Sequence, residues 1–114
     1  MSDEFLDFVE DILDAMDKVE LLVEGVDYDR FEADFRINFA VVRALEIIGE
    51  ASKRLPDDLR QRYPAVPWKG MAGMRDRIVH EYDNVDLQIV WDVVMKDIPH
   101  IKPQIQQILK DYGG

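Results

Sequence analysis

The sequence contains no cysteine, which excludes disulfide bonds, thiolate nucleophiles and thiolate metal sites. It also lacks any apolar run close to the roughly 20 residues that a membrane helix requires. The first residues, Met1 to Glu4, are acidic where a secretory signal would be basic. We therefore expect a cytoplasmic protein that has no membrane partner.

Several residue patterns that carry chemistry are missing as well. There is no HExxH or Glu-x-x-His pattern, and the two histidines, His80 and His100, are far apart in the chain. The glycines form neither a dinucleotide-binding nor a Walker loop, and the two serines, Ser2 and Ser52, lie in no nucleophile motif. We expect neither a metal ion nor a cofactor.

The charge of the chain is strongly negative but unevenly distributed. The 114 residues carry a net charge of −10, and their number fits one domain, 1–114. Residues 1–34 sum to −11, residues 35–80 to +4 and residues 81–114 to −3. A cationic surface on an acidic protein is compatible with a nucleic-acid partner; the alternative is that these charges are solvated helix faces.

Apolar residues recur at helical spacing through most of the chain, and no strand pattern accompanies them. The expected fold is all-α, an antiparallel up-and-down bundle of four main helices plus a short helix. Ser2 and Asp86 are the expected caps of the first and last helices, and prolines 99 and 103 predict a kink or break near Asp97. The first three expected main helices cover about residues 3–24, 30–55 and 67–82, and the short helix covers 56–62. The last helix follows its cap at Asp86 and has apolar residues at regular spacing from Leu87 to Ile108.

The helix predicted over 30–55 is apolar on two stripes, Phe31, Phe35, Val42 and Gly49 on one and Ile37, Val41, Ala44, Ile48 and Ala51 on the other. Such a helix must be covered on two sides. A second copy of the chain could cover one of them, which indicates a homodimer. Complete coverage by the helix's own neighbours is the alternative.

One stretch, Met74 to Tyr82, combines groups suited to phosphate chemistry. Arg75 has a permanently charged guanidinium group that can bind two phosphate oxygens, and His80 can exchange a proton near neutral pH. In a continuous helix the two would lie about 140° apart, so that a distortion or a second protomer would have to bring them to one atom. The alternative is a structural ion pair of Arg75 with Glu46 or Glu50, and a packing or capping role for His80.

A wider set of segments resembles the HepT branch of the HEPN superfamily. The stretch from Arg75 to Tyr82 has the form R-x4-H-x-Y, with a polar residue, Asp76, directly after the arginine. The other matching segments are Arg43 to Ala51, Arg54-Leu55-Pro56, Val66-Pro67-Trp68, Ala72-Gly73-Met74, Val85-Asp86 and Ile89-Val90-Trp91. They occur in the right order over nearly the whole chain.

The resemblance implies a helical homodimer that acts as the toxin of a type VII toxin–antitoxin pair of the HepT/MntA kind. It implies metal-independent RNA endonuclease activity and a minimal nucleotidyltransferase as antitoxin. That antitoxin would attach AMP to the motif tyrosine, Tyr82.

On this hypothesis His80 takes the proton of a ribose 2′-hydroxyl and Arg75 stabilises charge in the transition state. Asp76 orients one of these two side chains, and Arg77 contacts the RNA backbone. Two alternatives remain. One is a helical module that holds a nucleotide or a nucleotidyltransferase without cutting RNA, and the other is a structural adaptor in which Arg75 is buried in a salt bridge without an open groove.

Overall fold

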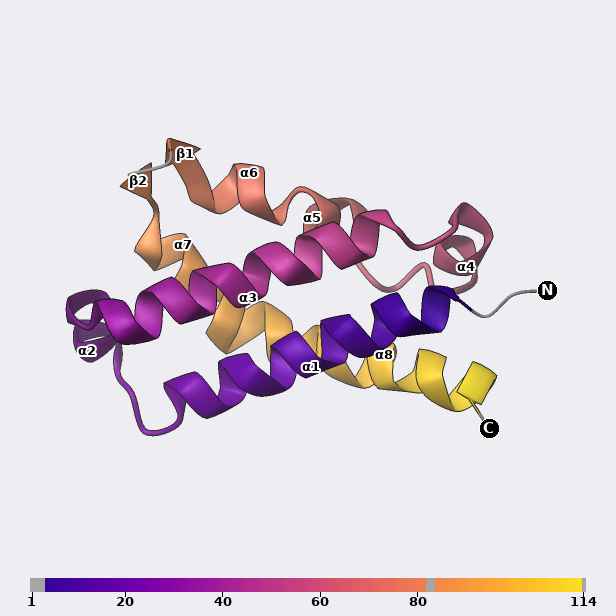
Figure 1. Ribbon diagram of the computed structural model, residues 1–114, viewed down its shortest axis with the longest axis horizontal. Coiled ribbons are helices and arrows are strands. Elements are labelled where there is room, and N and C mark those ends of the chain that lie inside the picture. Colours follow the sequence, from indigo (N-terminus) through magenta and orange to yellow (C-terminus); the bar gives the residue numbers. More distant parts are fainter. Residues whose placement is uncertain (1–3, 82–83, 114) are drawn as a thin grey trace.

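Two helices of 19 residues, α1 (Phe5–Val23) and α3 (Phe35–Lys53), lie side by side along the molecule in the computed structural model, which describes residues 4–81 and 84–113 (Figure 1). The buried residues Val9, Ile12, Met16 and Val19 follow the helical repeat along α1 and form the stripe that packs against α3. The last helix, α8 (Ile98–Gly113), packs on α1 as well.

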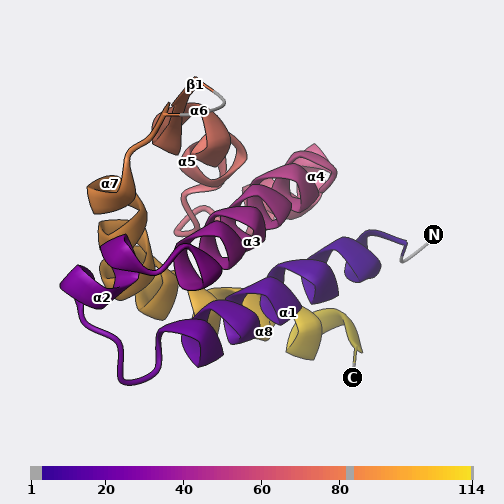
Figure 2. The same ribbon diagram turned by 60° about the vertical axis from the view of Figure 1, so that its left-hand side comes forward.

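The remaining elements are short, and most of them lie on the other side of α3 from α1 (Figure 2). Helix is the dominant structure in the described residues, which confirms the all-α prediction. No helix among these residues is both long enough and apolar enough to cross a bilayer. The short elements are α2 (Tyr28–Ala33), α4 (Asp57–Arg62), α5 (Trp68–Ala72), α6 (Met74–Ile78), β1 (Val79–Glu81), β2 (Asn84–Val85), α7 (Leu87–Asp92) and the π-helix η1 (Val93–Asp97).

The single helix predicted over 30–55 is wrong, because the chain bends at Asp34 and forms α2 and α3. Asp34 is extended, with φ −105° and ψ 99°, and its carboxylate accepts the N–H of Arg36 at 3.0 Å. Asp27 caps α2 in the same way, through the N–H of Arg30 at 2.9 Å. Aspartate side chains compete with the helix for backbone donors, so that they favour a new helix start over continuation.

The prediction of one helix over 67–82 is also wrong, because this segment forms two short helices and a strand. The expectation that the chain has no strands is therefore wrong as well. Gly73 separates α5 from α6, in line with the low helix propensity of glycine. Helix α6 ends at Ile78, and β1 and β2 then form an antiparallel hairpin in which Val79 pairs with Val85. The segment that contains His80 is therefore extended. Tyr82 and the predicted cap Ser2 lie outside the described residues.

The irregularity predicted near Asp97 is confirmed and takes the form of the wide turn η1. Pro99 has no N–H for the carbonyl of Met95 and would crowd it in a regular α-helix, whereas a π turn bonds one residue further along. The predicted cap at Asp86 is confirmed too, since its Oδ1 accepts the N–H of Ile89 at 3.1 Å.

Candidate functional site

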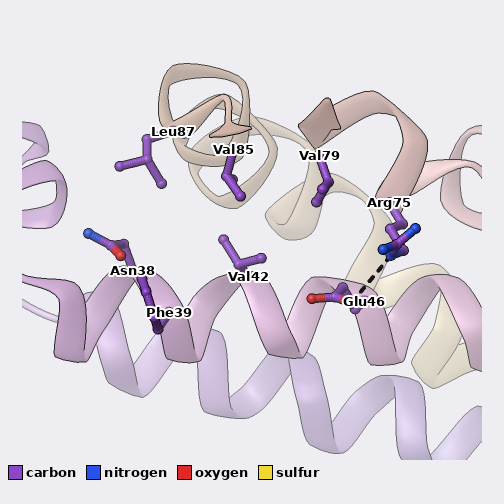
Figure 3. A pocket seen from close by; sticks show the side chains of 8 residues that line it. All are labelled: Asn38, Phe39, Val42, Glu46, Arg75, Val79, Val85 and Leu87. Atoms are coloured by element: carbon purple, nitrogen blue, oxygen red, sulfur yellow. Dashed lines mark ion pairs between the residues drawn. The ribbon is translucent and has the colours of Figure 1, made fainter. Parts of the chain in front are cut away.

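A groove of about 440 Å³ lies between α3 and the segment formed by α6, the hairpin and the start of α7 (Figure 3). Its middle is apolar, because Val42 on α3 faces Val79 and Val85 on the hairpin. Asn38 lies toward one end and the ion pair of Arg75 and Glu46 toward the other. The lining residues are Asn38, Phe39, Val42, Glu46, Arg75, Val79, Val85 and Leu87.

Arg75 is the cation of this groove. Its Nε lies 3.6 Å from Oε2 of Glu46, one of the two partners that the structural alternative named. The arginine side chain is nonetheless 56% exposed, and the glutamate side chain is 28% exposed. Arg75 is therefore accessible to a ligand in the groove, and the expectation of the structural-adaptor alternative, a buried salt bridge without a groove, is wrong.

Helix α5, which precedes Arg75 in the chain, packs closely against α3. A Cβ atom at Gly49 would lie only 3.1 Å from the carbonyl oxygen of Met71, a contact that glycine avoids. Met71 and Met74 are both buried on this side of the molecule. The approach at Gly49 therefore lets α6 begin against α3, one turn of helix away from Glu46.

His80 lies in β1 of the hairpin, at the position where the strand register is irregular between Val79 and Glu81. Val79 and its partner Val85 line the groove, whereas His80 and Asp86 are not among its described lining residues. The Nε2 atom of His80 lies 3.9 Å from Oδ2 of Asp86, and the histidine side chain is 53% exposed. The 140° separation calculated for a continuous helix does not apply, because α6 ends before His80.

The predicted site residues do not converge within one chain. No hydrogen bond or ion pair joins Arg75 to His80 in residues 4–81 and 84–113. Asp76 is exposed and has no such partner among these residues either. Arg77 forms an ion pair with Asp97 at 3.6 Å, beside a second cavity of about 180 Å³. It lies about 200° around α6 from Arg75.

Two exposed aromatic side chains near the groove were only partly anticipated. Phe35 and Phe39 are 66% and 73% exposed, with ring centroids 6.0 Å apart. Their i, i+4 spacing on α3 is a signal that sequence reasoning could have used for Phe39. Asn38 between them is buried, and its Nδ2 donates to the carbonyls of Phe31 at 3.0 Å and Glu32 at 3.2 Å.

Comparison with known proteins identifies the family. A family model described as Ribonuclease HepT-like matches residues 12–108. A Methanocaldococcus jannaschii protein named as a candidate RNase is 43% identical over 107 residues, which cover 94% of this chain and 88% of the relative. The "Probable ribonuclease HepT" of Thermococcus cleftensis is 41% identical over 104 residues, 91% of this chain and 94% of the relative. No solved structure matches the chain. The chain belongs to the HepT-like ribonuclease family.

Proposed function

We propose that this chain is a metal-independent RNA endonuclease that acts as the toxin of a HepT/MntA-like toxin–antitoxin pair. The observation that carries the proposal is the open groove with an exposed Arg75 in a member of the HepT-like ribonuclease family. An arginine that is half exposed can present its remaining N–H donors to a phosphate.

His80 removes the proton from a ribose 2′-hydroxyl, whose oxygen attacks the adjacent phosphorus. The bond from phosphorus to the 5′ oxygen breaks, and that oxygen takes a proton from solvent. Arg75 stabilises the negative charge of the transition state. Asp76 orients one of these two side chains and Arg77 contacts the RNA backbone, both in the RNA-bound state.

A homodimer completes the site. Phe35 and Phe39 leave an apolar patch on α3 that a second copy can cover. Because Arg75 and His80 are not joined within one chain, a two-fold axis near this patch would combine groups from both copies into one composite site.

The catalytic roles are tested with labelled RNA in buffer that contains EDTA. We expect wild-type cleavage of RNA but not of the matching DNA, and a loss of roughly 100-fold or more in Arg75→Ala and in His80→Ala. His100→Ala is the matched control, since His100 is the other exposed histidine. Equal rates in the wild type, Arg75→Ala and His80→Ala would contradict the assigned roles.

The non-catalytic alternative draws on one observation, the lack of contact between Arg75 and His80. A helical module that only holds a nucleotide or a nucleotidyltransferase needs the cation but no proton transfer. Such a module would bind RNA without cutting it, lose affinity in Arg75→Ala and keep it in His80→Ala. A binding assay run beside the cleavage assay separates the two functions.

A minimal nucleotidyltransferase antitoxin would neutralise this toxin by adding AMP to Tyr82. The added bulk and negative charge, two residues after His80 in the chain, would repel the RNA phosphates. Intact mass spectrometry after co-expression with such an enzyme should give increments of whole AMP units. These increments should disappear in Tyr82→Phe and persist in Tyr28→Phe; unmodified wild-type protein would contradict the proposal.

Sedimentation equilibrium tests the homodimer. Replacement of Phe35 and Phe39 together by glutamate should shift the protein from dimer to monomer. Leu21→Glu is the matched control, because Leu21 is equally exposed (71%) but lies on α1. A monomeric wild type would contradict the dimer.

A further inference from the structure

We propose that Asp86 is a positioning residue for His80, which fixes the proton of the neutral imidazole on Nε2 and leaves Nδ1 as the atom that accepts the 2′-hydroxyl proton. The inference rests on the proposed ribonuclease function of His80. It assigns to Asp86 a second task besides its role as the cap of α7.

Asp86 is held firmly by its own backbone and by α7. Its N–H donates to the carbonyl of Ile78 at 2.8 Å, which ties it to the end of α6. Its Oδ1 accepts the N–H of Ile89 at 3.1 Å, which fixes the carboxylate at the start of α7. The second oxygen, Oδ2, is the one that lies toward the imidazole.

The hairpin brings His80 to this oxygen. Val79 pairs with Val85, the N–H of Asp86 donates to the carbonyl of Ile78, and the strand register is irregular between Val79 and Glu81, at His80. In this arrangement the imidazole and the carboxylate lie close to each other. The distance of 3.9 Å between Nε2 and Oδ2 is that of an ion pair with a protonated imidazole. The proposed hydrogen bond of the neutral ring requires these two atoms to approach to about 3 Å.

The proposed hydrogen bond selects a tautomer. A neutral imidazole carries one N–H, and the hydrogen bond made by one ring nitrogen decides which nitrogen keeps the proton. The carboxylate accepts a hydrogen bond only, so it favours N–H at Nε2. The lone pair is then on Nδ1, and half of the side chain is open to solvent and to RNA. After proton transfer the ring carries a proton on each nitrogen, and Asp86 stabilises the cation.

The variant Asp86→Asn separates the two tasks, because asparagine caps helices as well as aspartate does but carries no negative charge and can donate a hydrogen bond to Nε2. Asp86→Ala removes both the cap and the charge. The urea midpoint of Asp86→Asn should therefore match that of the wild type, and Asp86→Ala should unfold at lower urea.

The first readout is the ¹⁵N NMR spectrum of the histidine side chains at a pH where they are neutral. The wild type should show His80 mainly as the Nε2–H tautomer, and Asp86→Asn should shift it toward Nδ1–H. His100 provides an internal control, since its signals should be the same in both proteins. An unchanged His80 spectrum in Asp86→Asn would overturn the proposal whether or not the protein cuts RNA.

The second readout is the rate of RNA cleavage. Asp86→Asn should lower kcat by roughly 10-fold or more with little change in KM, because general acid–base catalysis contributes about 10²–10⁴-fold and the variant favours the tautomer without a lone pair on Nδ1. An unaltered kcat would also overturn the proposal. If the wild type cuts no RNA, the ribonuclease function fails, but the tautomer measurement still decides the role of Asp86.

Discussion

The two faces of α3 differ in what covers them. Toward α1 and the core, the predicted stripe of Ile37, Val41, Ala44, Ile48 and Ala51 is buried throughout. Toward the groove, Phe35 and Phe39 are mostly exposed, and Val42 and Glu46 are half-buried. One helix therefore presents a face that is packed within the chain and a face that is open to a ligand or a second copy.

The difference shows that hydrophobicity alone does not indicate which face of a helix forms the core. Full burial of a phenylalanine side chain stabilises a protein by about 1.5–3 kcal/mol relative to exposure. A second copy of the chain that covers Phe35 and Phe39 can supply this stabilisation. The open face is also where Arg75 and the groove lie. Substitutions on the two faces should thus have different consequences.

The largest effect on stability should come from Ile48→Ala on the buried face. Ile48 is fully buried, so we expect its truncation to cost about 2–5 kcal/mol in the free energy of unfolding. Urea unfolding followed by circular dichroism measures the change. Ile47→Ala, at the half-buried neighbouring position, should cost less; equal costs would show that complete burial does not set the contribution of Ile48.

Asn38 lies at the border between the two faces, and Asn38→Ala should cost about 1–3 kcal/mol. The substitution leaves the carbonyls of Phe31 and Glu32 without their donor. Gln88→Ala is the control, because Gln88 is an exposed amide whose side-chain hydrogen bond within the described residues is to Asp92. A cost no greater than that of Gln88→Ala would show that Asn38 does not join α2 to α3.

Asp34 sets the direction in which α3 begins, and Asp34→Ala should lower Tm by about 4 °C through loss of the cap. The hydrogen bond from the Arg36 side chain holds the pKa of Asp34 below its ordinary value of 3.8. The contribution of the carboxylate is therefore complete above that pH and is lost as the pH falls through the lower, folded-state value. Thermal unfolding at pH 6 and at pH 3 should give a smaller difference between wild type and variant at pH 3.

The smallest effect on the monomer is expected for Phe39→Ala, less than about 0.5 kcal/mol, because the ring is mostly exposed. Its effect should instead depend on protein concentration, since association stabilises the folded state by mass action. The Tm of the wild type should rise with concentration more steeply than that of the variant. Parallel curves would mean that Phe39 takes no part in self-association.

The sequence predicted the helical class, the first helix, the short helix after Pro56 and the cap at Asp86, because each depends on neighbours within one or two turns. It also identified Glu46 as an alternative partner of Arg75. These features follow from local periodicity and from the short list of acids that a cationic side chain could reach.

The hairpin could not be predicted in the same way. Its strands of three and two residues are too short for a period-two pattern, and the motif continued the helical spacing of the residues before it. The pairing of His80 with Asp86 depends on this hairpin, so it was missed as well. The exposure of Phe35 and Phe39 depends on which helices cover α3, which no local pattern records.

Each of the three basic residues from Arg75 to His80 is already matched with an acid from another part of the chain. Arg75 lies 3.6 Å from Glu46, Arg77 lies 3.6 Å from Asp97, and His80 lies 3.9 Å from Asp86. An RNA phosphate that contacts Arg75 or Arg77 would exchange with Glu46 or Asp97, and the freed acid would take up cations from solution, whereas Asp86 would stay with His80. Fewer counterions are then released per contact, so RNA affinity should fall less steeply with salt than on a surface of bare cations.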